Sequence, residues 1–271
     1  MTIVTTVVKI GGRVTNSAIS EPALNDLAHI LSHGPIILVH GGGDVVTDVA
    51  EKLGVQQKFV TSPEGFRSRY TDAETIQVFT MVMAGKMNKE IVRRLQNAKI
   101  SAIGLSGVDG GLIRAERKQK LVVKDERGRR RIIEGGYTGK VTHVDGTLIQ
   151  TLLNSGYVPV IAPIALGSEN EFLNLDGDRT AAYVAGAIRA DVLLLLTDVE
   201  GISLASAVMP HLSAAEAKQK IPDLGPGMIT KVYAALEALS MGVGKVIISS
   251  GHRENPFSSA IEGRAGTVLE P

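Results

Sequence analysis

The sequence predicts an α/β fold in which a mainly parallel central sheet is covered by helices. Two observations support this prediction. Short runs of β-branched residues alternate with helix-length amphipathic stretches, which is typical of parallel strands joined by helical crossovers. In addition, the runs Ile36–Val39 and Val192–Leu196 are apolar at consecutive positions, as expected for strands buried on both faces. These two runs are therefore predicted to be central strands.

Six strands and seven helices can be placed in order along the chain. The strands are predicted at Val4–Ile10, Pro35–His40, Ile100–Leu105, Tyr157–Ile161, Val192–Leu196 and Lys245–Ser249. The helices are predicted at Glu21–Leu31, Asp44–Leu53, Asp72–Gln96, Thr147–Asn154, Asp178–Arg189, Ala214–Lys220 and Met228–Met241. Thr71 or Asp72 can cap the long third helix, because both side chains accept hydrogen bonds from the first N–H groups of a helix.

Two features interrupt this alternation. The segment Leu112–Glu134, with Glu126–Arg129 at its middle, is predicted to be a hairpin. A polar turn near Ala165–Glu169 follows a strand. We expect it to divide the chain into two lobes of one continuous sheet, residues 1–167 and 168–271.

The composition is that of a globular protein with a full core. Of 271 residues, 44% are hydrophobic and 21% are charged. The chain has no cysteine, which rules out disulfides, thiolate metal sites and a cysteine nucleophile and fits a reducing compartment. Residues 1–10 lack the pattern of a signal peptide, and no apolar run approaches the ~20 residues of a membrane span. We therefore expect a cytoplasmic protein without a membrane partner.

Charge is distributed unevenly. The net charge of +1 gives no reason to expect nucleic acid as a partner, yet residues 114–131 hold nine Lys or Arg against three Asp or Glu. This basic segment is interpreted either as a solvated hairpin or as a binding site for an acidic partner or an anionic ligand.

Glycines follow the first two predicted strands. Lys9–Gly12 ends the first strand, and His40–Gly43 ends the second, directly before a helix. Glycine lets a phosphate approach the backbone, and a helix N-terminus favours negative charge. The predicted phosphate-binding residues are Gly11, Gly12, Gly41, Gly42 and Gly43. Neither cluster matches the Walker or Rossmann pattern, which disfavours a P-loop enzyme and a Rossmann dehydrogenase.

Nine motifs in this order and spacing resemble the N-acetylglutamate kinase branch of the amino acid kinase family, across essentially the whole chain. They are Lys9–Gly12, His40–Gly43, Arg69–Asp72, Ala84–Lys89, Ile103–Gly107, Gly136–Lys140, Asn174–Asp178, Thr197–Gly201 and Gly225–Met228 with Lys231. The resemblance implies a three-layer αβα sandwich of the carbamate kinase-like type. It also implies an N-terminal lobe for the acyl substrate, a C-terminal lobe for ATP, and a homodimer built through the helix 72–96.

The activity implied by the resemblance is ATP-dependent phosphorylation of a carboxylate to an acyl phosphate. Mg²⁺ is expected on the ATP phosphates, with no dedicated metal site in the protein. The implied catalytic residues are Lys9, Lys231 and Asp178, the last as the group that orients both lysines. The implied acyl-substrate residues are Arg69 for the α-carboxylate, Asn174 for the amide, Gly42 and Gly43. The implied nucleotide-binding residues are Thr197, Asp198, Gly201, Gly225, Gly227 and Met228.

Within this branch, the segments Gly65–Asp72 and Glu116–Lys118 and the arginine-rich hairpin look most like those of the kinases that act on aminoadipate or glutamate attached to the carrier protein LysW. Arg67 and Ser68 precede Arg69 where ordinary acetylglutamate kinases have a shorter motif. The predicted carrier-binding residues are Arg67, Arg129, Arg130 and Arg131.

Three alternatives stay open at this point. The chain could phosphorylate free N-acetylglutamate in arginine biosynthesis, or it could be a nucleotide-binding regulatory or storage protein on the same fold. Phosphorylation of UMP or isopentenyl phosphate is also compatible with the fold, but Arg69–Asp72 and Asn174 suit an α-carboxylate and an amide better.

Overall fold

The computed structural model describes residues 4–204 and 207–271; the start of the segment examined for a signal peptide, residues 1–3, lies outside them. The α-helices are α1 Thr15–Ala18, α2 Glu21–Leu31, α3 Gly43–Lys52, α4 Ala73–Thr80, α5 Asn88–Asn97, α6 Gly146–Asn154, α7 Gly177–Ala187, α8 Ala214–Lys220, α9 Pro226–Ser240 and α10 Pro256–Ile261. The strands are β1 Thr6–Ile10, β2 Ile36–His40, β3 Lys58–Thr61, β4 Arg67–Tyr70, β5 Ala102–Ser106, β6 Ile113–Arg117, β7 Lys120–Lys124, β8 Arg130–Glu134, β9 Gly139–Val144, β10 Val158–Ala162, β11 Ile164–Leu166, β12 Phe172–Asn174, β13 Val192–Thr197, β14 Ser203–Leu204, β15 Ala207–Val208, β16 His211–Ser213, β17 Lys245–Ser250 and β18 Thr267–Glu270.

The main sheet has eight strands in the order β16-β18-β17-β13-β1-β2-β10-β5. The six predicted strands are confirmed as β1, β2, β5, β10, β13 and β17, and they are neighbours that pair in parallel. The sequence prediction missed β16 and β18, which complete one edge; β18 runs antiparallel to β17. Because β1 lies at the centre, its carboxyl end meets the ends of strands from both halves of the chain.

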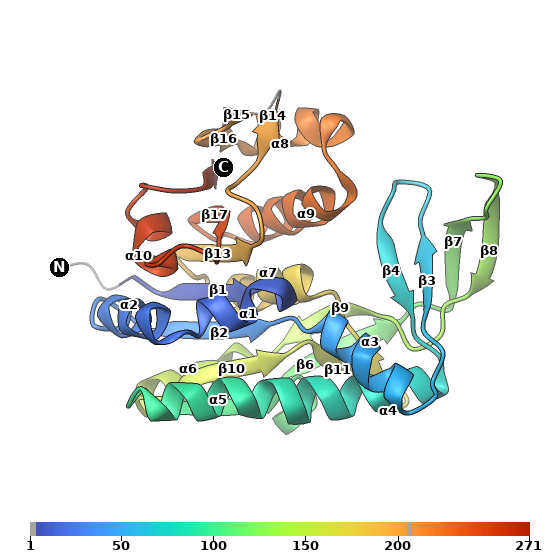
Figure 1. Ribbon diagram of the computed structural model, residues 1–271, viewed down its shortest axis with the longest axis horizontal. Helices are drawn as coiled ribbons and strands as arrows, with labels where there is room; N and C mark the ends of the chain where they lie inside the picture. The colour runs from blue at the N-terminus through green and yellow to red at the C-terminus, as the bar shows by residue number, and fades with distance from the viewer. Residues whose placement is uncertain (1–3, 205–206) are drawn as a thin grey trace.

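Each central strand contributes to two cores, one on each side of the sheet. Val7 packs in the core under α6, α7 and α9, while the adjacent Val8 packs in the core under α2, α5 and α10. Leu193 and Leu194 divide in the same way. This confirms the predicted three-layer αβα arrangement, with helices on both faces of the sheet, in front of it and behind it in Figure 1.

The predicted hairpin at Leu112–Glu134 is wrong in its extent. Only β7 and β8 form a hairpin, turning at Gly128 with a φ of +74°. β6 instead pairs with β9 in a second sheet of order β12-β11-β6-β9, because its alternate residues Ile113 and Ala115 are buried in the main core. A further hairpin, β3–β4, was not predicted. The two hairpins lie against each other beyond one end of the main sheet (Figure 1).

The long helix predicted at Asp72–Gln96 is confirmed as a continuous helical stretch from Ala73 to Asn97, but its middle part changes type. Asp72 caps α4 as predicted, since its carboxylate accepts a hydrogen bond from Thr75 N at 2.9 Å. Between α4 and α5 the chain forms a π-helix, Met81–Met87. Its Met83 and Met87 side chains face the glycine turn after β2, where a Cβ on Gly42 would lie 3.1 Å from each. π-helical segments occur frequently at functional sites, and this one packs against a predicted phosphate-binding loop.

The predicted lobe border at residue 167 falls in the turn between β11 and β12, which pair with each other. The division into lobes at 1–167 and 168–271 stays a prediction. None of the helices in the described part of the chain has the length and apolar character needed to cross a membrane.

Candidate active site

Three charged side chains meet at the carboxyl end of the central strand. Lys9 is in β1, Asp178 is in the first turn of α7, and Lys231 is in the second turn of α9. Lys9 Nζ lies 2.8 Å from Asp178 Oδ1, and Lys231 Nζ lies 3.0 Å from Asp178 Oδ2. The three side chains are only 10%, 6% and 14% exposed, respectively. We call this group the lysine–aspartate cluster. One carboxylate therefore holds two ammonium groups from elements far apart in the sequence.

The electrostatics of the cluster follow from this pairing. Burial alone raises the pKa of Asp178, but Lys9 and Lys231 more than offset burial and lower that pKa to about 2. Burial alone lowers the pKa of Lys9, but the Asp178 carboxylate reverses the effect and the pKa is raised. These shifts keep Asp178 and Lys9 ionised at neutral pH, and the formal charges of the three side chains sum to +1.

The two glycine turns pack directly on each other beside this cluster. A Cβ on Gly12 would lie 3.0 Å from Gly42 N, so a larger residue would push the turns apart. The N–H groups of Gly11 and Gly41 donate to Leu196 O and Ile10 O within the sheet. The first N–H groups of a helix have no partner inside it, and α3 begins at Gly43. An anion beside Lys9 would thus face the N-terminus of α3.

A buried histidine supports the second glycine turn. His40 Nδ1 donates to Gly41 O at 3.1 Å, and Asn88 Nδ2 donates to His40 Nε2 at 3.3 Å and to Val160 O at 2.9 Å. Because Gly41 O can only accept, Nδ1 carries the proton. Burial, assisted by the charges of Lys9 and Lys89, lowers the pKa of His40 to about 4. His40 is therefore a neutral spacer between α5 and the glycine turn, and its role was not anticipated from the sequence.

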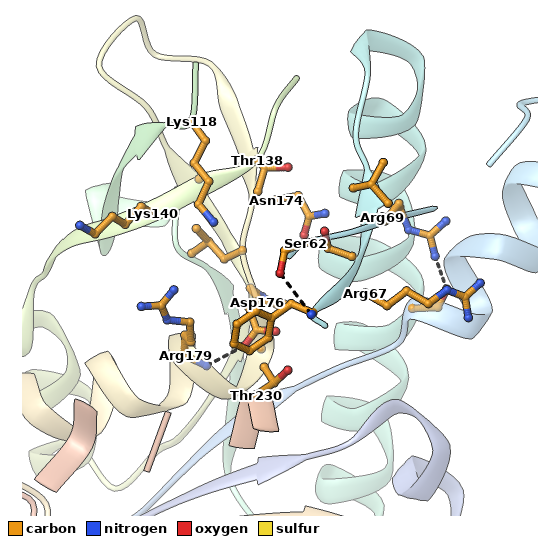
Figure 2. A pocket seen from close by; sticks show the side chains of 18 of the residues that line it. Ser62, Arg67, Arg69, Lys118, Thr138, Lys140, Asn174, Asp176, Arg179 and Thr230 are labelled. Carbon is orange, nitrogen blue, oxygen red and sulfur yellow. Dashed lines mark hydrogen bonds between the residues drawn. The ribbon is translucent and has the colours of Figure 1, made fainter. Parts of the chain in front are cut away.

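A cavity of 700 Å³ opens from Lys9 and Gly41–Gly43 into the space between the two hairpins. Figure 2 shows its polar side chains. Lys118, Lys140 and Arg179 lie on one side, Arg67 and Arg69 lie on the other, and Thr138 and Asn174 lie between them. The volume is within the range of small-molecule binding sites.

Arg69 and Asn174, the predicted acyl-substrate residues, both line this cavity. Arg69 Nη2 donates to Gly43 O at 2.7 Å and to Thr47 Oγ1 at 2.9 Å, and Nη1 donates to Gln57. Asn174 Nδ2 donates to Thr71 Oγ1 at 2.9 Å. Both side chains are thus held in one orientation at the cavity wall, and the guanidinium is tied to the glycine turn itself.

The predicted nucleotide-binding residues lie outside the lining of this cavity, on the C-terminal half of the sheet edge. Thr197 ends β13, and the next residue, Asp198, accepts from Arg13 Nη1 at 3.0 Å. At Gly201 a Cβ would lie 2.7 Å from Thr267 Oγ1. Gly225 is the N-cap of α9, whose first turn contains Gly227 and Met228. Thr197 and Asp198 follow the carboxyl end of a central strand, where α/β sheets bind ligands, and Gly225–Met228 open the helix that carries Lys231.

The predicted carrier-binding arginines are in two environments. Arg67 lines the cavity and stacks on the Phe59 ring, with 4.6 Å between its Cζ atom and the ring centroid. Arg129 and Arg131 are exposed on the β7–β8 hairpin, where both form ion pairs with Asp125, at 3.0 and 3.4 Å. Arg130 is exposed on β8. Part of the charge of the basic segment is therefore balanced within the hairpin.

Sequence comparisons place the chain among kinases. The family described as "Amino acid kinase family" matches residues 4–250. A relative from Cenarchaeum symbiosum (strain A) is 53% identical over 262 residues, 97% of this chain and 98% of the relative. Its name provisionally assigns the activity LysW-aminoadipate/LysW-glutamate kinase. Relatives that carry this name without qualification come from Saccharolobus solfataricus and Saccharolobus islandicus (strain L.S.2.15). They are 48% and 47% identical over 264 residues, 97% of this chain and 98% of each relative.

Solved structures share the fold. The protein smu.665 from Streptococcus mutans UA159 aligns with a TM-score of 0.79 at 24% identity, covering 98% of each chain. Carbamate kinase from Giardia lamblia bound to AMP-PNP aligns with a TM-score of 0.67 at 14% identity, covering 99% of this chain and 98% of that one. At these identities the comparison confirms the carbamate kinase-like fold and carries nothing about substrate.

Proposed function

Because this chain belongs to the amino acid kinase family, we propose that it transfers the γ-phosphoryl group of ATP to the side-chain carboxylate of 2-aminoadipate attached to a LysW carrier protein. LysW-bound glutamate is the second substrate of this proposal, and the product is an acyl phosphate for lysine or arginine biosynthesis. Relatives that are 47–48% identical over 97% of the chain bear the corresponding name. The observation that carries the proposal is the pairing of Lys9 and Lys231 with Asp178 beside the cavity.

The reaction needs charge neutralisation more than proton transfer. A carboxylate oxygen of the substrate attacks the γ-phosphorus, the bond between that phosphorus and the β,γ-bridging oxygen breaks, and ADP leaves with the bond electrons. The substrate carboxylate is already ionised, so Asp178 is not required as a base. Lys9 would meet the phosphoryl group from the acceptor side and Lys231 from the nucleotide side. Asp178 would fix both ammonium groups before the reactants arrive, which is the preorganisation that such catalysis requires.

ATP would lie at the C-terminal half of the sheet edge, beside the helix that carries Lys231. The excess positive charge of the cluster and the N-termini of α3 and α9 would all face the phosphates. The residues proposed to border the nucleotide are Thr197, Asp198, Gly201, Gly225, Gly227 and Met228, and the glycines proposed near the transferred group are Gly11, Gly12, Gly41, Gly42 and Gly43. Mg²⁺ would be carried on the ATP phosphates, where it supplies further charge neutralisation.

The acyl substrate would occupy the cavity with Arg69 and Asn174 as its anchors. Arg69 would bind the α-carboxylate, because a planar guanidinium can present two parallel N–H groups to a carboxylate. Asn174 would bind the amide that joins the amino acid to its carrier. Gly42 and Gly43 adjoin Arg69 through its bond to Gly43 O. This arrangement aims the substrate's distal carboxylate toward Lys9 at the inner end of the cavity.

The carrier would dock on the two hairpins that frame the cavity, with Arg67, Arg129, Arg130 and Arg131 attracting an acidic surface. We also propose that the protein is a cytoplasmic homodimer assembled through the α4–α5 helical segment. Met81, in the π-helix between α4 and α5, is 57% exposed, as a residue of an unoccupied interface would be.

The test is ADP release by the purified protein with ATP and Mg²⁺, comparing LysW carrying aminoadipate, LysW carrying glutamate, and free N-acetylglutamate. Turnover restricted to the carrier-bound compounds is expected. Faster turnover of free N-acetylglutamate would instead identify an arginine-pathway kinase that needs no carrier. ATP binding without ADP release on any of the three would indicate a nucleotide-binding protein that is not a kinase. Lys9→Met serves as the inactive control.

A further inference from the structure

A second group of cations lines the cavity across from Arg69. Lys118 lies in the link between β6 and β7, Lys140 is in β9, and Arg179 is in α7. Figure 2 shows these three side chains on the side of the cavity opposite Arg67 and Arg69. We call them the cationic wall. Arg179 was not identified from the sequence, and Lys118 and Lys140 were identified only as parts of motifs that carry the family resemblance.

The wall carries more positive charge than its neighbours balance. Arg179 is paired with Glu237, with 2.8 Å between Arg179 Nε and Glu237 Oε2. Among the described residues, no carboxylate oxygen lies within ion-pair distance of the Lys118 or Lys140 ammonium groups. Burial and the nearby charge of Arg179 lower the pKa of Lys118; the attraction of Asp176 and Glu237 does not offset this. An ammonium in this position gains stability if an anion joins it.

The backbone around the wall is fixed. Lys118 N donates to Thr138 O at 2.9 Å, and Gly135 N donates to Gln119 O at 2.9 Å. A Cβ on Gly135 would lie 1.5 Å from Lys118 O, so this crossing of strands admits only glycine. Arg179 is held at both ends, because its N–H donates to Asp176 Oδ1 at 2.9 Å and its guanidinium is bound to Glu237. The backbone that carries Lys118 and the side chain of Arg179 are therefore preformed features of the fold.

The side chains that lie between the cationic wall and Arg69 can form hydrogen bonds with an amide. Asn174 and Thr138 form a β-bridge with each other and lie between the wall and Arg69 in Figure 2. A ligand that spans the cavity would place an amide at Asn174, one carboxylate at Arg69 and a second anionic group at Lys118. Free N-acetyl amino acids have only a methyl group beyond the amide and would leave the wall unmatched.

We propose that Lys118, supported by Lys140 and Arg179, forms a subsite for a second carboxylate of the acyl substrate, located on the group attached to the substrate's amide. This inference rests on the proposed function and deepens it. Arg69 binds the carboxylate of the amino acid itself, and the cationic wall binds the carboxylate of the residue to which that amino acid is joined. The wall thereby distinguishes a linked substrate from a free acetylated one within the cavity, without any contact from the body of a carrier.

The experiment uses two synthetic probes that differ by one carboxylate, N-glutaryl-aminoadipate and N-butanoyl-aminoadipate. Their affinities are measured by titration calorimetry, and their turnover is measured by ADP release. The wild-type protein is expected to bind the glutaryl compound at least about tenfold more tightly, the effect of one charged hydrogen bond. Lys118→Met is expected to reduce this preference to about one, Lys118→Arg to retain most of it, and Lys140→Met to reduce it in part.

Lys124→Met is the matched control, because Lys124 is exposed on the neighbouring strand β7 and does not line the cavity. It should keep the full preference, and thermal denaturation should show all variants folded. Equal affinity for the two probes in the wild-type protein, including no detectable binding of either, would overturn the subsite. A preference that survives both Lys118→Met and Lys140→Met would overturn it as well. A glutaryl preference without ADP release on the probes or on loaded LysW would support the subsite while refuting the kinase proposal.

Discussion

The lysine–aspartate cluster and the cationic wall both place positive side chains beside the same cavity, but only in the cluster does every ammonium group have a carboxylate partner. In the cluster, two buried ammonium groups share the Asp178 carboxylate at 2.8 and 3.0 Å. In the wall, Lys118 and Lys140 have no such partner among the described residues. A balanced, buried group can hold its geometry before a reactant arrives, whereas an unbalanced one gains its partner from the ligand. We therefore expect substitutions in the cluster to change the rate of phosphoryl transfer and the stability of the fold. Substitutions of the cations that line the cavity, at the cationic wall or at Arg69, should change the affinity for the acyl substrate.

The largest loss of activity and stability is expected from removing the Asp178 carboxylate, which pairs with both lysines of the cluster. Asp178→Asn leaves two buried ammonium groups facing a neutral amide, so both lysines lose their fixed positions. We expect kcat to fall about 100- to 1000-fold and the free energy of unfolding to fall by about 3–5 kcal/mol. ADP-release kinetics and urea denaturation measure the two effects. Asp125→Asn, which removes an exposed carboxylate paired with Arg129 and Arg131, should alter neither measurably. Wild-type kcat in Asp178→Asn would show that the cluster has no catalytic role.

The next largest effect is a loss of stability at low pH, which we expect from the neutral His40 behind the glycine turn. Its pKa of about 4 in the folded protein lies below the ordinary value near 6.5. The unfolded chain therefore binds the extra proton first as the pH falls. Stability is fully present above pH 6.5 and is lost as the pH decreases toward 4. Between pH 7.5 and 5 the free energy of unfolding should decrease by about 2 kcal/mol from this group alone.

Urea denaturation of the wild type and of His40→Asn at both pH values isolates this contribution. Asparagine can still donate to Gly41 O but does not titrate, so the variant should lack the decrease assigned to His40. An identical pH dependence in the two proteins would contradict it. The paired carboxylate of Asp178 contributes in a separate window, between pH 4 and 2, because its pKa is lowered to about 2.

A smaller effect, on the binding of the acyl substrate, is expected from Arg69, which lies across the cavity from the cationic wall. Arg69→Lys keeps one charge but loses the planar pair of N–H donors and the bonds to Gly43 and Thr47. We expect KM for the acyl substrate to rise about 10- to 100-fold, with a much smaller change in kcat. Arg67→Lys is the matched control, because Arg67 is on the same strand and stacks on the same Phe59 ring. It should leave KM for a small acyl substrate nearly unchanged. A loss confined to kcat would assign Arg69 to the phosphoryl group instead.

The contrast between cluster and wall also explains how much could be predicted from the sequence. The six predicted strands were found because they are short runs rich in β-branched and apolar residues, and their carboxyl ends lie at one edge of the sheet. The role of Asp178 in orienting Lys9 and Lys231 was implied by the family resemblance, and the structure brings the three side chains together. Their catalytic role stays a prediction. The strands that were missed are short or polar. β3, for example, has exposed or half-buried side chains along its whole length and pairs only with β4.

Lys118 illustrates why the wall could not be predicted. It belongs to a run of basic residues in which Lys118, Lys120 and Lys124 look equivalent. Only the pairing of β6 with β9, rather than with β7, turns Lys118 into the cavity while the other two stay exposed. That pairing depends on the burial of Ile113 and Ala115 against the main core, which is a tertiary effect. The π-helix at Met81–Met87 is similar, since no local residue signals the extra turn geometry.

The smallest effect on substrate affinity is expected from the exposed arginines of the β7–β8 hairpin, Arg129, Arg130 and Arg131. These side chains are exposed, and two of them already share Asp125, so each contributes little on its own. Changing all three to Ala should raise KM for a loaded LysW carrier about 3- to 10-fold at low ionic strength and leave KM for N-glutaryl-aminoadipate unchanged. The difference should disappear at 0.5 M salt, because the Debye length then falls to about 4 Å and long-range attraction is screened. An equal loss with carrier and small probe would place these arginines in the structure of the cavity rather than in docking, whereas no loss with either would leave Lys118 and Arg67 as the cations that a carrier meets first.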